Sequence, residues 1–104
     1  MIHVIAIITT LPGKRETVLK EFNAIVPLVL DETGCIEYQP VVDSEAGLGG
    51  HSEFGADTYV VIEKWESMNT LKAHSQSAHM LDYGKRVSGL IADRSIHVME
   101  NSSS

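Results

Sequence analysis

A chain of 104 residues can form one domain with a single hydrophobic core but not two stable domains. The composition is 43% hydrophobic and 21% charged, and no apolar run approaches the roughly 20 residues of a membrane-spanning helix, so we expect a soluble protein without a membrane span. The formal net charge of -6 excludes nucleic acids and anionic membranes as expected partners, because both are bound by clustered lysine and arginine side chains.

The first apolar stretch follows Met1 directly, without a basic segment before it or a small-residue cleavage site after it. This pattern is typical of a strand and not of a signal peptide, so we expect a cytoplasmic protein. Cys35 is the only cysteine, which rules out an intrachain disulfide and a CxxC metal motif. We interpret it as a small buried residue at the start of a strand.

A strand and a helix are predicted in the first third of the chain. Residues 2–9 are almost all apolar or β-branched, which suits a strand that is covered on both faces. From about Arg15 to about Glu32 the apolar residues recur with a helical period. Pro27 lies inside this segment and predicts a kink or an early break, and Gly34 is expected to end it.

Two further strands, separated by a long loop, are predicted next. Residues 35–43 alternate, and Pro40 confines this strand to an edge of the sheet or to a bulge. Residues 44–57 hold four glycines and show neither a helical nor a strand period, and a loop of this length is either mobile or a lid. Residues 58–65 alternate as the third strand. One face of that strand carries Tyr59, Val61, Glu63 and Trp65.

The end of the chain predicts a helix and a last strand. Ser67 is placed to cap a helix that covers residues 69–90 and is interrupted near residues 75–77. Residues 95–100 alternate as the fourth strand, and residues 101–104 form a polar tail.

The predicted order βαββαβ is that of the ferredoxin-like fold, an α+β arrangement with an antiparallel sheet and both helices on one face. We therefore expect one domain over residues 1–100. The other face of the sheet lacks a cover, although the strands at residues 2–9 and 58–65 are apolar on both faces. A second copy of the chain is the expected cover, which would make the protein a symmetric homodimer.

His74 and His79 could form a metal site, a proton-transfer site or two surface positions. A zinc site on one helix needs histidines three or four residues apart. These two are five apart, about 140° around a continuous helix. Only a break at residues 75–77 would bring them together, so the spacing predicts no metal site.

From the residues alone, His74 is as compatible with the polar feature of a small-molecule pocket as with a position that has no function. The pocket would lie where the inward face of strand 58–65 meets the second helix, and apolar walls with few polar groups are typical of such sites. Its predicted walls are Trp65, Leu71, Met80 and Tyr83.

The second histidine shares a helical face with two other candidate residues. His79, Tyr83 and Arg86 follow one another at helical spacing. The residues alone leave open that Trp65 is a core residue, that Arg86 pairs with Asp82, and that Tyr83 packs with its hydroxyl in water.

Three segments carry a resemblance to a known family: IVPLVLDETGCIEYQPVVD, VIEKWESMNTLKAHSQSAHM and DYGKRV. They resemble the antibiotic biosynthesis monooxygenase family, and more closely its branch of YgiN-like bacterial quinol monooxygenases. The pattern E-x-W-E-S…L-x-A-H…H-M points to the family, and IVP…GC…Y…VD points to the branch. The similarity extends from the first predicted strand to the last.

The resemblance implies a homodimeric α+β barrel and a monooxygenase that uses O2 without flavin, haem or metal. The implied substrate is a hydroquinone such as menadiol, which is oxidised toward the quinone. The positions that match the family are Cys35, Tyr38, Trp65, His74, His79, Met80 and Tyr83.

Within this resemblance, our hypothesis is that a quinol loses a proton to His74 or His79, because imidazole titrates near neutrality. The resulting anion is electron-rich enough to reduce O2 itself, and loop 44–57 could close over the ligand. The residues expected to bind the substrate are Trp65, Tyr83, Met80, Tyr38, Leu71 and Arg86.

Other functions on the same fold are weighed against this hypothesis. Haem-degrading members of the family carry a tryptophan and a histidine on the second helical segment and an asparagine on the first strand. The corresponding positions here are His74, the neighbourhood of Gly84, and Ile7, which disfavours haem degradation. An isomerase or hydrolase of a small oxygenated metabolite, and a non-catalytic quinone-binding dimer, remain alternatives.

Overall fold

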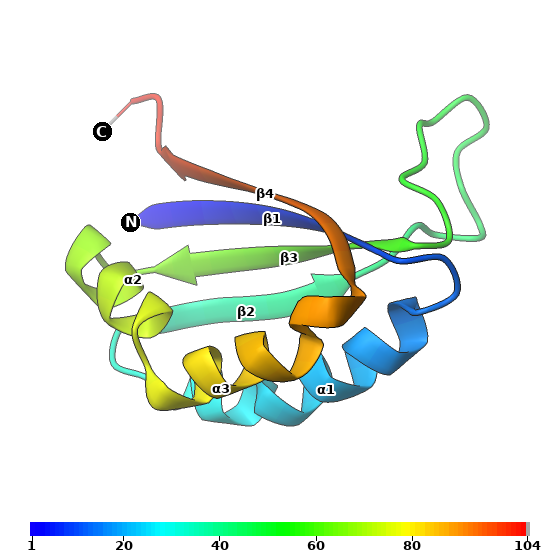
Figure 1. Ribbon diagram of the computed structural model, residues 1–104. Coiled ribbons are helices and arrows are strands. Elements are labelled where there is room, and N and C mark those ends of the chain that lie inside the picture. Colours follow the sequence, from blue (N-terminus) through cyan, green and yellow to red (C-terminus); the bar gives the residue numbers. More distant parts are fainter. Residues whose placement is uncertain (104) are drawn as a thin grey trace.

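A four-stranded antiparallel sheet carries all of the helices on one face (Figure 1). The computed structural model describes residues 1–103. The strands are β1 (Ile2–Thr10), β2 (Cys35–Val41), β3 (Thr58–Trp65) and β4 (Ile91–Glu100), in the spatial order β2-β3-β1-β4. The helices are α1 (Arg15–Leu30), α2 (Met68–Ser75) and α3 (Ala78–Val87), followed by a 3₁₀ turn at Ser88–Leu90. The α+β ferredoxin-like arrangement predicted from the sequence is confirmed.

The second helical segment is interrupted where the sequence predicted a break. Ser67 caps α2, because its Oγ accepts the backbone N–H of Thr70 at 3.2 Å while the Thr70 hydroxyl accepts the backbone N–H of Ser67 at 3.2 Å. Helix α2 ends at Ser75 and α3 begins at Ala78, so the two helices can take different directions.

Pro27 lies inside α1 without breaking it. A proline removes one backbone donor, and here the helix continues for only three residues, to Leu30, before a turn in which the N–H of Asp31 bonds to the carbonyl of Pro27 at 3.2 Å. The helix is held in place by its buried stripe. That stripe consists of Val18, Phe22, Ile25 and Val29, at the spacing that the sequence predicted.

The last strand begins at Ile91 and not at Ser95 as predicted. Asp93 and Arg94 are charged and gave no strand pattern, but both pair with β1 in the sheet, Asp93 with Thr9 and Arg94 with Ile8. Pairing with a neighbouring strand therefore outweighs the weak local preference of this segment for a strand.

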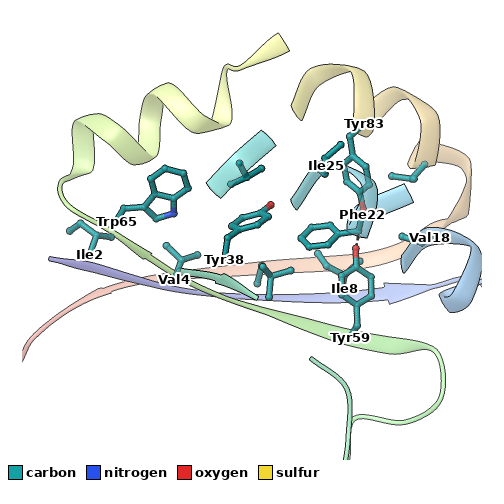
Figure 2. Close-up of a cluster of buried hydrophobic side chains, with 14 residues drawn as sticks. Ile2, Val4, Ile8, Val18, Phe22, Ile25, Tyr38, Tyr59, Trp65 and Tyr83 are labelled. Atoms are coloured by element: carbon teal, nitrogen blue, oxygen red, sulfur yellow. Dashed lines mark hydrogen bonds between the residues drawn. The ribbon is translucent and has the colours of Figure 1, made fainter. Parts of the chain in front are cut away.

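The hydrophobic core lies between the sheet and the helices (Figure 2). Phe22 of α1 is at its centre, where its ring centroid lies 5.3 Å from that of Tyr38, 5.6 Å from that of Tyr59 and 5.7 Å from that of Tyr83. Such stacked and edge-to-face pairs add to the stability that apolar burial provides. The cluster brings aromatic side chains of α1, β2, β3 and α3 together beside the helix-facing side of the sheet.

The opposite face of the sheet has no helix on it. The strand register places Ile5 beside Ile62 and Ile7 beside Val60 on this face, so its centre is apolar. The homodimer remains a prediction, because the structure of one chain does not show what covers this face. Among residues 1–103, none of the helices has the length and apolar character needed to cross a bilayer.

Loop 44–57 contains neither helix nor strand, as predicted. It leaves the sheet at the end opposite to α2 (Figure 1). The carboxylate of Asp43 closes its base by accepting the backbone N–H groups of Phe54 at 3.0 Å and Gly55 at 2.8 Å. This geometry places the loop away from the second helical segment.

Candidate active site

The break between α2 and α3 brings His74 and His79 to the same carboxylate. Ser77 stabilises the break, because its hydroxyl donates to the carbonyl of His74 at 2.8 Å and its backbone N–H reaches the same carbonyl at 3.1 Å. His79 then lies in the first turn of a new helix, so the separation expected on a continuous helix does not apply.

That carboxylate belongs to Glu32, in the turn after α1. Its Oε2 lies 2.9 Å from Nδ1 of His74 and 2.7 Å from Nε2 of His79. A carboxylate only accepts hydrogen bonds, so both of these ring nitrogens carry the protons. The opposite nitrogen of His74, Nε2, makes no hydrogen bond within residues 1–103.

Glu32 is a site residue that the sequence did not reveal. It is separated from His74 by 42 residues, and no spacing rule along a helix relates the two. The only local signal is an acidic residue just after a predicted helix, which is common on protein surfaces. In the part of the chain that the structure describes, no three histidine, cysteine, aspartate or glutamate side chains are arranged to hold a metal ion.

A cavity of about 1020 Å³ lies between the sheet and helices α2 and α3. Its lining includes helix-facing residues of β1, β3 and β4, and it opens to solvent beside Leu81 and Ile96, which are exposed. No residue of loop 44–57 lines it, so the lid remains a prediction. Of the predicted site residues, five line the cavity: Tyr38, Leu71, His74, Met80 and Tyr83.

Trp65 does not line the cavity, contrary to the predicted pocket wall. Its side chain is fully buried, and its ring centroid lies 4.6 Å from that of His74. Trp65 is therefore a core residue that supports the imidazole of His74. Its indole Nε1 donates a hydrogen bond of 2.9 Å to Oε1 of Glu63.

Glu63 is the second acidic residue of the site, and it lines the same cavity as His74. The sequence placed Glu63 on the inward face of β3 but did not single it out. Burial raises the pKa of its carboxyl, an effect that the hydrogen bond from Trp65 and the nearby His74 partly offset. A carboxylate at an inward position of a buried strand is the signal that could have identified it.

Tyrosines form one wall of the cavity. Tyr59 and Tyr83 join their hydroxyls at 3.0 Å across the gap between β3 and α3 (Figure 2), so the Tyr83 hydroxyl is not left in water. The hydroxyl of Tyr38 donates to Sδ of Met80 at 3.9 Å. Burial raises the pKa of all three phenols, which therefore stay neutral at physiological pH.

Arg86 and His79 lie outside the cavity. The guanidinium of Arg86 pairs with Asp82, as one of the sequence interpretations proposed, and its Nε lies 3.0 Å from Oε2 of Glu21. Arg86 therefore ties α3 to α1 and does not reach the cavity. His79 contacts the site through Glu32. Its side chain is 24% exposed, compared with 6% for that of His74.

Comparison with known proteins matches residues 1–86 to the family described as antibiotic biosynthesis monooxygenase. The probable quinol monooxygenase YgiN of Escherichia coli (strain K12) is 43% identical over 102 residues, which cover 96% of this chain and 97% of that protein. A protein of the same name from Shigella flexneri is equally similar, with 43% identity over 102 residues and the same coverage of 96% and 97%.

Solved structures share the fold at lower identity. PA3566 from Pseudomonas aeruginosa superposes with a TM-score of 0.82 at 24% identity, covering 98% of this chain and 94% of that one. The putative antibiotic biosynthesis monooxygenase from Nitrosomonas europaea superposes with a TM-score of 0.83 at 16% identity, covering 98% and 99%.

Proposed function

The chain belongs to the antibiotic biosynthesis monooxygenase family, and from this premise we propose that it is a quinol monooxygenase. It would oxidise a hydroquinone of the menadiol type toward the quinone, with O2 as co-substrate and no bound cofactor. The observation that carries the proposal is His74, which presents a free ring nitrogen in a largely apolar cavity. The name of the relative with 43% identity supports the choice of a quinol.

The cavity suits an aromatic diol. Leu71 and Met80 offer apolar contacts, and Tyr38 and Tyr83 offer aromatic ones. Apolar walls with a few convergent polar groups are typical of small-molecule sites. Trp65 packs against the imidazole of His74 from the core and supports it. We do not include Arg86 among the substrate contacts, because its guanidinium pairs with a carboxylate outside the cavity.

His74 is the proposed base. Its Nε2 would take a proton from a quinol hydroxyl, and the ionised Glu32 at its Nδ1 would stabilise the imidazolium that forms. His79 holds the same oxygen of Glu32 and would act through it. The quinol anion can then pass electrons to O2 within the largely apolar cavity.

Two overall reactions of the quinol with O2 are balanced in atoms and electrons. Removal of two electrons and two protons from the quinol yields the quinone, with O2 reduced to hydrogen peroxide. Insertion of one oxygen atom yields a hydroxylated quinone, with the other atom released as water. Oxygen-18 gas with mass analysis of the product distinguishes the two, since only insertion places the label in the quinone.

We also propose that the protein is a cytoplasmic homodimer. The apolar centre of the uncovered sheet face, around Ile5 and Ile62, supports a second copy as its cover. Sedimentation equilibrium tests the dimer, and Ile62→Lys should shift it toward the monomer. Cell fractionation tests the location.

The deciding experiment is oxygen uptake with a panel of quinols. We expect His74→Ala to lower kcat/KM by about 100-fold or more and His79→Ala to lower it less, because only His74 faces the cavity. His51→Ala, in the exposed part of loop 44–57, is the matched control.

Three outcomes would contradict the proposal. An unchanged rate of quinol loss without oxygen would exclude a monooxygenase. Turnover of other metabolites without oxygen uptake would favour an isomerase or hydrolase. Tight quinone binding with no effect of His74→Ala on the lifetime of the quinol would favour a non-catalytic binding dimer.

A further inference from the structure

Glu63 is a buried acid, and no lysine or arginine among residues 1–103 pairs with it. It lies on β3, beside Val4 of β1 and Tyr38 of β2 in the strand register, and only 7% of it is exposed. Within residues 1–103, the one hydrogen bond to its carboxyl comes from the neutral indole of Trp65, which engages Oε1. Oε2 is left for another partner.

A carboxylate in this position is costly for the fold. Burying an ionised acid without a charged partner is strongly unfavourable relative to burying an apolar side chain. A glutamine would accept the same hydrogen bond from Trp65 without that cost. The acid is therefore better explained by chemistry in the cavity than by stability of the core.

We propose that Glu63 is a catalytic residue of this site, a second proton acceptor that faces one hydroxyl of the bound quinol while His74 faces the other. The inference rests on the proposed function and extends it. Trp65 links the two groups, since it donates to Glu63 and packs against His74. Glu63 and His74 are thus two proton acceptors beside the same indole ring, which suits a substrate with two hydroxyl groups.

The step that Glu63 performs is a proton transfer. The O–H bond of the quinol breaks, an O–H bond forms on Oε2, and the negative charge moves from the carboxylate to the quinol oxygen. Burial supports this transfer, because it makes the carboxylate a stronger proton acceptor than one in water. The proton then passes to the reduced oxygen as hydrogen peroxide or water forms, which returns Glu63 to the carboxylate. Because the quinone has no hydroxyl to donate, this carboxylate beside its carbonyl oxygen repels the product and favours its release.

Other titratable groups set the charge at Glu63. His74 on α2 and Glu32 in the turn after α1 act electrostatically on its carboxyl, and Glu63 in turn raises the pKa of Tyr38 and of Cys35 on β2. The pH profile of the wild type reports all of these groups together. A substitution at Glu63 is therefore required to assign its part.

The test compares Glu63→Gln with the wild type and with Glu66→Gln, which alters an exposed acid three residues further along. Oxygen uptake gives kcat/KM for the quinol, and quenching of the single tryptophan, Trp65, gives the Kd of the quinone. We expect Glu63→Gln to lower kcat/KM by about 100-fold or more. We expect it to bind the quinone roughly threefold tighter or more, because an amide N–H can donate to the quinone carbonyl.

The two readouts separate catalysis from structure. A variant that turns over within a few-fold of the wild type would overturn the proposal. Parallel loss of quinol turnover and quinone binding would also overturn it, because that pattern indicates a misshapen cavity. If Glu63→Gln does not fold, Glu63→Asp takes its place, with kcat/KM lowered and quinone binding retained as the expected result.

Failure of the proposed function would be visible separately. If the wild type consumes no oxygen with any quinol, the quinol monooxygenase is excluded. The quinone titration still decides whether Glu63 faces the ligand, and equal quinone affinities of the wild type and Glu63→Gln would place Glu63 away from it.

Discussion

Nδ1 of His74 lies 2.9 Å from Oε2 of Glu32, a contact between the second helical segment and the turn that follows the first helix. His79 reaches the same oxygen from α3 at 2.7 Å. One carboxylate thus holds α2 and α3 to the end of α1 and orients the imidazole that faces the cavity. Its removal should affect the fold as well as the reaction.

Glu32→Ala is expected to destabilise the protein. The substitution leaves the buried Nδ1–H of His74 without an acceptor, which costs about 1–3 kcal/mol. Urea unfolding measures the change. Glu45→Ala, in the exposed loop, is the control and should stay within about 0.5 kcal/mol of the wild type. Equal stability of the two variants would show that the carboxylate does not hold the helices.

The stability contributed at Glu63 should fall as the pH rises. Burial raises the pKa of this carboxyl in the folded state, so the folded protein binds the proton more tightly than the unfolded chain. Below the ordinary carboxyl pKa both states are protonated and no stability is lost. Above it the unfolded chain ionises first, and stability declines until the folded group has also ionised.

The measurement is the difference in unfolding free energy between Glu63→Gln and the wild type as a function of pH. As the pH rises from the ordinary carboxyl pKa to the raised pKa of Glu63, the Glu63→Gln variant should become increasingly stable relative to the wild type. Asp43 acts in the opposite sense, because the N–H groups of Phe54 and Gly55 lower its pKa, but it is common to both proteins and cancels. A difference that does not vary with pH would contradict the expectation.

Cys35 should be a slow nucleophile. Burial raises the pKa of its thiol to about 11, with Glu32 and Glu63 adding to the effect. At pH 8 only about one thiol in a thousand is then ionised, so alkylation by iodoacetamide should be about a hundredfold slower than that of a free cysteine. Mass spectrometry gives the rate, because Cys35 is the only cysteine. A rate that levels off below pH 9 would be inconsistent with a raised pKa.

Gly34→Ala is expected to destabilise the protein more than Gly13→Ala. Both glycines have a positive φ, 83° and 77°, which an alanine adopts at a cost of about 1 kcal/mol or more. At Gly34 the new Cβ would also lie 2.4 Å from Cγ2 of Thr70, whereas nothing lies within 4 Å of one at Gly13. Thermal unfolding of both variants isolates the steric contribution, and equal losses would mean that Thr70 moves aside freely.

Much of the fold could be predicted from local patterns. The third strand, the cap at Ser67 and the break at residues 75–77 all follow from alternation, capping chemistry and a polar interruption, which act between residues close in sequence. The start of β4 could not be predicted, because Asp93 and Arg94 take part in the sheet through their neighbour β1.

The candidate site depended more on packing. The residue pattern predicts that His74 follows a strand ending in Trp65, and that Glu63 and Trp65 share a face. The packing of the helices on the sheet shows that Glu32 binds both histidines, that Trp65 supports His74 from the core, and that Arg86 lies outside the cavity. Local patterns specify periods and caps, whereas these contacts join residues from different elements and exist only once the helices pack on the sheet.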